Sequence, residues 1–198
     1  MDYNCVNLDN MDLYFVKTKK FKSIDIKIFF CDEVCKDDVT WRNCLMDVLS
    51  YATKKYPTRK DFSIHLNDLY SLYLTASNMR FGNYLISKIG VSFLNPKYTE
   101  EGIIEKSLEL LREIIFEPLV INNHFNKEYL DFIKMEQKAD TETIKEDSKG
   151  YSSIRLLENM DSDMPYTISG YSDLSVLEKI NENNLYEYYQ KFIRNNKV

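Results

Sequence analysis

The stretch Thr40–Lys55 carries an apolar pattern that fits an amphipathic helix better than any other local structure. Its large apolar residues recur at i, i+3, i+4, i+7 and i+8, namely Trp41, Cys44, Leu45, Val48 and Leu49. Residues at this spacing share one stripe of a helix. The stripe therefore predicts a helix packed against a core, and Pro57 predicts that the helix ends before Tyr56, because proline disfavours helical geometry in the preceding residue.

Strands are predicted on both sides of this helix. Ser23–Cys31 alternates isoleucines with polar residues, which is the period of a strand with one buried face. We expect it to pair in an antiparallel hairpin with the short apolar run Leu13–Lys17. A second hairpin is predicted for Leu72–Phe81 and Tyr84–Leu94, because the Gly82-Asn83 turn between them tolerates a positive φ.

The rest of the chain is predicted to be mainly helical. Helices are expected after an N-cap at Thr58, over Thr99–Phe116, and from Asn122 or Asn123 to about Lys149, the last with an apolar side of Phe125, Tyr129, Phe132, Ile133 and Met135. A loop over Asp161–Tyr171 separates the later helices, which are Ser152–Met160, Leu174–Ile180 and Glu182–Asn195. Because strand runs precede helix runs, the fold class is α+β, an antiparallel sheet with helices packed on it. No flexible linker divides residues 1–198, so a single domain is expected.

Composition narrows the possible functions. The net charge of -5 and the scattered lysines provide no basic surface for nucleic acid. The first residues lack the charge and apolar segments of a signal peptide, and no run approaches 18 apolar residues. We therefore expect a cytoplasmic protein that binds neither nucleic acid nor membrane, with its four cysteines reduced.

A second stripe of the same predicted helix has the spacing of a metal site but lacks the residues for one. Asn43, Met46 and Asp47 stand at i, i+3 and i+4, where three side chains can converge on a metal and a water. Only Asp47 is a plausible zinc ligand, so Asn43 and Asp47 are read as polar surface or interface residues. His65 and His124 have no second histidine nearby and are also expected at the surface.

Several segments resemble the M16 metallopeptidases, the family of insulinase, pitrilysin and the mitochondrial processing peptidases. The resemblance rests on the order of elements and on four sequence features: Leu49–Pro57, the Gly82-Asn83 hairpin, Ile115–Leu119, and Pro165-Tyr166 followed by Gly170-Tyr171. The chain is most similar to the non-catalytic bacterial M16 subunit. The resemblance implies an M16-like (LuxS/MPP-like) domain corresponding to one half of such a protein, at its N-terminal side.

The same resemblance locates the catalytic motif. Active members carry His-x-x-Glu-His on this helix, and registering Ala52-Thr53 on the Gly-Thr of the family places the motif over residues 43–47. Neither histidine is present, and Met46 replaces the glutamate that activates water. The third ligand, a later glutamate, would fall near Phe132 or Ile133, whereas Glu128 and Glu136 are out of register.

The expected function is a catalytically silent M16-like domain that binds an extended peptide or acts as a partner subunit, without a cofactor. Its expected partner is an active M16 homologue or its own second half. The alternative is a zinc-dependent metalloendopeptidase with non-standard ligands. In the family, a final core strand begins where this sequence reaches Asn196-Lys197-Val198, so we expect a fragment that lacks one strand and exposes a sheet edge. Such an edge favours a homodimer.

Overall fold

A computed structural model describes residues 3–8, 11–160 and 164–195. The expected loop therefore lies partly, at 161–163, outside the described residues, and the expected start of a strand at 196–198 lies wholly outside them. The strands are β1 (Tyr3–Leu8), β2 (Met11–Val16), β3 (Ser23–Glu33), β4 (Tyr73–Phe81), β5 (Tyr84–Leu94), β6 (Val120–Ile121) and β7 (His124–Phe125). The α-helices are α1 (Lys36–Tyr51), α2 (Arg59–Asp68), α3 (Ile103–Phe116), α4 (Lys127–Thr143), α5 (Ser148–Glu158), α6 (Leu174–Lys179) and α7 (Glu182–Asn195).

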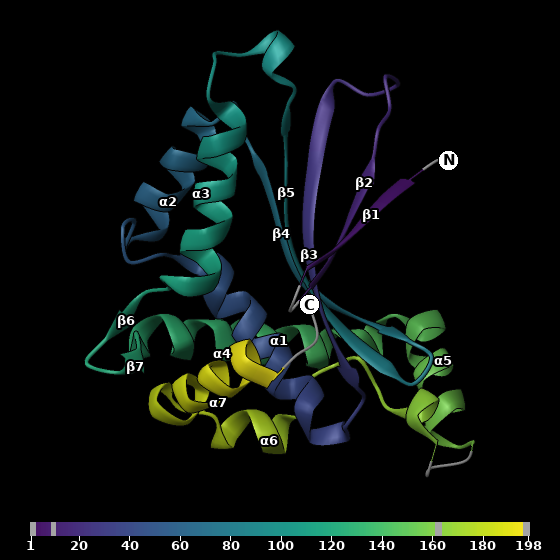
Figure 1. Cartoon of the computed structure of the whole chain (residues 1–198). Helices are drawn as coiled ribbons and strands as arrows, with labels where there is room; N and C mark the ends of the chain where they lie inside the picture. The colour runs from purple at the N-terminus through teal and green to yellow at the C-terminus, as the bar shows by residue number, and fades with distance from the viewer. Residues whose placement is uncertain (1–2, 9–10, 161–163, 196–198) are drawn as a thin grey trace.

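A three-stranded antiparallel sheet, in the order β3-β5-β4, forms the framework of the domain. Helix α1 contacts β4 and β5 and also α3, α4, α6 and α7, so it lies at the centre of the core (Figure 1). Leu45 and Leu49 of α1, Ile89 of β5, Ile114 of α3 and Leu185 of α7 are fully buried there. This arrangement confirms the predicted α+β class.

The stripe that predicted α1 is the one that enters the core. Cys44, Leu45 and Leu49 are fully buried, and Trp41 stacks on Tyr188 of α7 with ring centroids 5.4 Å apart. The predicted bounds were wrong, because the helix begins at Lys36 after Cys35 and ends at Tyr51. Beyond it, Ala52 is extended and Thr53 forms a β-bridge with Pro118, so tertiary pairing ends the helix before Pro57 can.

The first predicted hairpin is wrong in its pairing. β2 pairs with β1, a strand that the pattern did not predict, and β3 pairs with β5. The second predicted hairpin is confirmed, since β4 and β5 pair from Tyr73↔Ser92 to Phe81↔Tyr84. Gly82 at its turn has φ +58°, a conformation that costs a residue without Cβ little energy.

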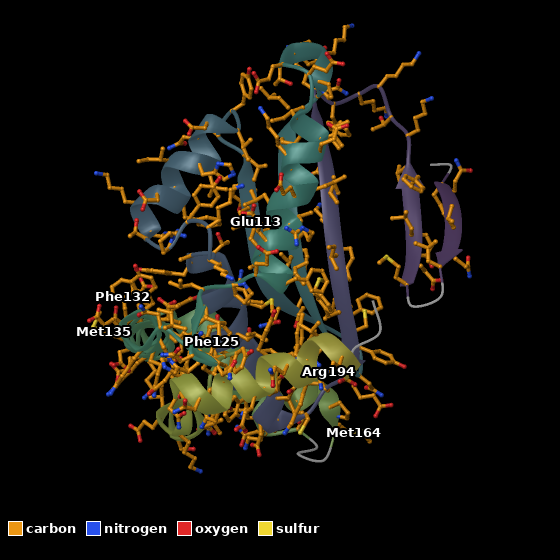
Figure 2. All side chains as sticks on the ribbon, turned by 60° about the vertical axis from the view of Figure 1, so that its left-hand side comes forward. Glu113, Phe125, Phe132, Met135, Met164 and Arg194 are labelled. Carbon is orange, nitrogen blue, oxygen red and sulfur yellow. The ribbon has the colours of Figure 1, made fainter. Side chains whose placement is uncertain are left out.

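The long predicted helix after Asn122 is divided. Asn122 and Asn123 have positive φ and turn β6 into β7, so Phe125 is a strand residue and Asn126 is the N-cap of α4. Phe132 and Met135 are exposed on α4, as Figure 2 shows, whereas Leu130, Ile133 and Gln137 are buried. The predicted apolar side, from Phe125 to Met135, is wrong because this segment is not one continuous helix.

No helix in the described ranges is both long and apolar enough to cross a membrane.

Candidate functional site

The predicted stripe Asn43, Met46 and Asp47 lies beside an open pocket of about 240 Å³. The pocket lies where α1, β4, α4 and the segment 170–172 meet, and its lining includes the three stripe residues together with Asn78, Gln137 and Asp140. Most of the lining residues are polar, whereas Met46 is 1% exposed and packs into the core. The site that sequence reasoning located is therefore a hollow in the surface, formed by segments far apart in the sequence.

Asn43 is held on three sides by hydrogen bonds. Its Nδ2 donates to the carbonyl oxygen of Gly170 at 3.0 Å and to Oγ of Ser172 at 3.2 Å. Its Oδ1 accepts from Nδ2 of Asn78 on β4 at 2.9 Å. The residue in the position of the first family histidine thus ties α1 to the sheet edge and to the 170–172 segment.

Asp47 is bound by a residue that the sequence did not single out. Nε2 of Gln137 on α4 donates to Oδ2 of Asp47 at 2.5 Å, and Oε1 of Gln137 accepts from Oγ of Ser172 at 3.0 Å. Gln137 is 8% exposed and Ser172 is 7% exposed, so these bonds lie largely out of water. Asn43 and Asp47 are therefore linked through Ser172 and Gln137 by direct hydrogen bonds.

The network continues from Asn43 into the core. Oγ of Ser87 on β5 donates to Oδ1 of Asn78 at 2.6 Å, and Nη1 of Arg42 donates to that hydroxyl at 3.4 Å. Nε of Arg42 donates to Oδ2 of Asp38 at 2.5 Å, and the hydroxyl of Tyr188 on α7 donates to Oδ1 of the same carboxylate. Polar contacts thus run without interruption from α7 to the pocket.

The charge of the pocket is acidic. Burial raises the pKa of Asp47, the bond from Gln137 lowers it, and the nearby carboxylates of Glu136 and Asp140 raise it further. Asp140 is exposed and lines the same pocket. A cationic group entering the pocket would relieve this repulsion between carboxylates.

The donor set does not suit zinc. Zinc in proteins takes Cys, His, Asp or Glu ligands, and an asparagine amide and a methionine thioether are not among them. Burial raises the pKa of Cys44 to about 12, so its thiol stays neutral and faces the core. Within the described residues, no three His, Cys, Asp or Glu side chains gather where a metal could bind.

The two histidines lie away from the pocket. His65 on α2 stacks on Tyr56 with ring centroids 4.1 Å apart, and burial lowers its pKa. Nδ1 of His124 in β7 lies 3.0 Å from the carbonyl oxygen of Phe125. Neither residue lines the pocket, so the structure does not bring either histidine to the candidate site.

Neither residue at the expected position of the third ligand lines the pocket. Phe132 is exposed and Ile133 is buried in the core, whereas Gln137, four residues after Ile133, faces Asp47. Gln137 carried no local signal, because its partner Asp47 lies 90 residues earlier in the chain. Asn78 and Ser172 carried no local signal, because they reach the site only through contacts 35 and 129 residues from Asn43.

Comparison with known proteins found no matching family model. A probable inactive metalloprotease, YmfF of Bacillus subtilis (strain 168), is 28% identical over 187 residues, which are 93% of this chain and 44% of that protein. The chain therefore spans less than half the length of this curated relative.

Solved structures share the fold. A conserved protein from Enterococcus faecalis V583 superposes with a TM-score of 0.93 at 23% identity, covering 100% of this chain and 47% of that chain. An inactive M16 peptidase domain from Pseudomonas fluorescens gives a TM-score of 0.73 at 14% identity, covering 96% of this chain and 43% of its own. A protease from Helicobacter pylori gives 0.71 at 13% identity, with the same coverage of 96% and 43%. The resemblance to the M16 peptidases and the M16-like fold are confirmed.

Proposed function

We propose that this chain is a catalytically silent M16-like domain that binds an extended peptide along the outer edge of β4, beside the pocket that replaces the zinc site. The observation that carries the proposal is the juxtaposition of that edge with the pocket, whose lining includes Ala76, Ser77 and Asn78 of β4. An exposed strand edge can hold a peptide by main-chain hydrogen bonds, and this mode of binding needs no metal.

The hydrogen-bond register identifies the β4 groups that face outward. The amides of Val34 and Asn95 donate to the carbonyls of Asn83 and Lys22. In an antiparallel pair, hydrogen-bonded and non-bonded residue pairs alternate. The registers of β3 with β5 and of β5 with β4 extend this alternation to β4. The N–H and C=O groups that point toward β5 are therefore those of Tyr73, Thr75, Ser77, Met79 and Phe81.

The alternate β4 residues, Leu74, Ala76, Asn78 and Arg80, therefore present their N–H and C=O outward. In the part of the chain that the structure describes, no backbone hydrogen bond from outside the sheet reaches them. Ala76 also lines the pocket. A strand added at this edge would therefore extend past the pocket and could place a side chain in it.

The chemistry of the pocket favours a basic side chain. Asp47 and Asp140 supply negative charge, and the amide and hydroxyl groups around them supply further acceptors. Lysine and arginine side chains carry donors only, so both match this lining. We propose peptides with basic residues as the preferred ligands.

The proposed setting is a two-part peptide chamber in the cytoplasm. The relatives extend well beyond the part that this chain matches. We propose that residues 1–198 act as one domain and form one wall, and that an active M16 homologue or a second half of the protein supplies the other. The metallopeptidase alternative would need zinc ligands besides Asp47, because Asn43 and Met46 do not supply them.

Fluorescence anisotropy with a labelled ten-residue peptide of alternating valine and lysine tests the proposal. We expect saturable binding that EDTA does not change and that leaves the peptide intact. Methylating alternate main-chain nitrogens of the peptide should weaken binding about tenfold or more, because each lost hydrogen bond costs about 1 kcal/mol. Ala76→Pro removes an outward N–H and should weaken binding similarly.

Asp25→Pro is the matched control, because it alters the opposite edge of the same sheet and should leave peptide binding unchanged. Zinc-dependent cleavage of the peptide would support the metallopeptidase alternative. Absence of binding, or equal affinity for the methylated peptide, would exclude recognition at the β4 edge.

A further inference from the structure

The connection between β2 and β3 is rich in positive charge. Four of its six residues are lysines, namely Lys17, Lys19, Lys20 and Lys22. All six residues are exposed. In the described ranges, no carboxylate forms an ion pair with any of these lysines. The charges of the connection are therefore free to meet a partner.

A second segment, the short 3₁₀ helix η1 (Pro96–Tyr98), lies against this connection. The amide of Asn95 donates to the carbonyl oxygen of Lys22 at 2.8 Å, and Oδ1 of Asn95 accepts from the amide of Lys97 at 3.0 Å. Nζ of Lys22 lies 5.6 Å from the centroid of the Tyr98 ring, and Nζ of Lys97 lies 6.0 Å from it. Residues 17–22 and 96–98 thus form one surface, which we call the basic tip.

The basic tip lies at one end of the molecule. Figure 1 shows the β2–β3 connection and η1 at the end opposite α6 and α7, and Figure 2 shows the same arrangement from another side. Composition alone indicated scattered lysines, whereas the fold gathers five of them here. Because the whole chain has a net charge of -5, the remaining surface is acidic, and the basic tip is its positive end.

Apolar side chains stand among these lysines. Phe21 is 63% exposed and Tyr98 is 50% exposed, and the exposed Leu94 ends β5 beside them. The phenyl ring of Phe21 has no polar group, so its transfer from water into an apolar layer is favourable. Lysine can lay its aliphatic stem along such a layer while its ammonium group stays in water. Lysines interleaved with exposed aromatic residues are typical of surfaces that bind membrane interfaces.

We propose that the basic tip binds the surface of a membrane that contains anionic lipids. The lysines would pair with the anionic headgroups, and Phe21 would enter the boundary between headgroups and acyl chains. The acidic remainder of the molecule would then face away from the lipid. This inference goes beyond the proposed peptide binding at β4 and does not depend on it.

Single-stranded nucleic acid fits the same surface less well. Proteins bind it by combining positive charge with aromatic rings on which bases stack. The Tyr98 ring already has Lys22 and Lys97 over it, so a base that stacked there would have to displace a lysine. The observations therefore favour lipid.

Sedimentation with lipid vesicles tests the proposal on the 198-residue chain. We expect binding to vesicles of equimolar phosphatidylglycerol and phosphatidylcholine, and none to vesicles of phosphatidylcholine alone. Added salt should release the chain, because it screens the attraction between the lysines and the headgroups. Absence of binding to the anionic vesicles, or equal binding to both kinds, would overturn the proposal.

Two double variants locate the contact. Lys19→Gln combined with Lys20→Gln should weaken vesicle binding about 25-fold, because each lysine near an anionic membrane contributes about fivefold. Lys127→Gln combined with Lys138→Gln is the matched control, since it removes the same charge from exposed residues of α4 and should not weaken binding. If the two double variants bind alike, the basic tip is not the binding surface.

Phe21→Ser separates a membrane from other anionic partners. This variant keeps every lysine but removes the ring, so vesicle binding should weaken about tenfold. Vesicle binding equal to that of the parent would overturn the proposal, since a partner that only pairs with charge does not need the ring. Binding of a labelled oligothymidylate without binding of anionic vesicles would assign the basic tip to nucleic acid and overturn the proposal as well.

Discussion

The two edges of the sheet differ in the polar side chains that lie beside them. Beside β4, the residues that stand in the place of a zinc motif are tied together through Asn43, Ser172, Gln137 and Asp47 by direct hydrogen bonds. Beside β3, the outward backbone groups of the odd-numbered residues from Ser23 to Cys31 have no backbone partner in the described ranges. The backbone of β4 is equally open from Leu74 to Arg80, but hydrogen-bonded side chains lie beside it.

This difference lies in the side chains rather than in the backbone. Amide and hydroxyl groups at the β4 site supply the hydrogen bonds that a buried carboxylate needs, so the site is stable without a metal. Along β3, the outward main-chain groups of Ser23 to Cys31 alternate with the half-buried Ile24, Ile26 and Ile28. Ligand binding is the direct test of the pocket.

The largest expected effect comes from breaking the network at its buried charge. Arg42 is 1% exposed and pairs with Asp38 at 2.5 Å and with Asp32 at 3.2 Å. Arg42→Met should lower the free energy of unfolding by about 3–5 kcal/mol, because it leaves the Asp38 carboxylate without its charged partner. Urea denaturation measures the loss.

Arg112→Met is the control for this change. Arg112 pairs with Glu117 at 2.7 Å but lies on the surface, where ion pairs contribute little. It should leave the unfolding midpoint unchanged. If the two arginine variants behave alike, the buried network does not stabilise the site edge.

A second experiment compares the core around α1 with the β1–β2 hairpin, by truncating one leucine in each. Leu45→Ala empties a fully buried position in α1 and should cost about 2–5 kcal/mol of unfolding free energy. Leu13→Ala in β2 truncates a side chain that is 38% exposed, so in the isolated chain it should cost less than about 0.5 kcal/mol. A large loss for Leu13→Ala would mean that the β1–β2 hairpin packs against the body in solution, contrary to the exposure of its residues.

The sequence predicted the elements whose signals are local. The stripe of Cys44, Leu45 and Leu49 identified α1, and Gly82 identified the β4–β5 turn, since periodicity and turn chemistry both act over a few residues. Asn43 and Asp47 line the same pocket, because α1 carries both on one side.

Two features could not be predicted without knowing the fold. They are the pairing of the strands and the residues Gln137 and Ser172, which complete the hydrogen-bond network of the site. Alternation in Ser23–Cys31 indicates a strand and its buried face, but it does not identify the partner strand, so the neighbour of β3 was assigned wrongly. Gln137 was missed because its partner Asp47 lies 90 residues away, so no local pattern distinguishes it from the other polar residues of α4. Ser172 meets Asn43 across 129 residues, a separation that no local pattern encodes.

The smallest expected effect is a dependence on pH at Asp47. Burial raises its pKa above the ordinary value of 3.8, so the folded state holds the proton more tightly than the unfolded state does. That contribution to stability is present below pH 3.8 and is lost as the pH rises through the folded pKa. Asp47→Asn keeps an oxygen for Gln137 and removes the charge. Relative to the parent, the variant should gain stability as the pH rises from 3.8 to 7. Urea denaturation at each pH measures this difference in the free energy of unfolding.

Asp131→Asn is the matched substitution, since Asp131 is an exposed carboxylate on the same helix as Gln137. At pH 7 it should leave the unfolding midpoint close to that of the parent, because substitutions on the exposed surface usually change stability little. If Asp47→Asn is less stable than the parent at pH 7 and equal to it at low pH, the charged carboxylate is the better partner for Gln137 and the desolvation argument fails. The site would then hold a stabilised anion, and a cationic ligand would have to compete with Gln137 for it, which would weaken the case for basic peptides.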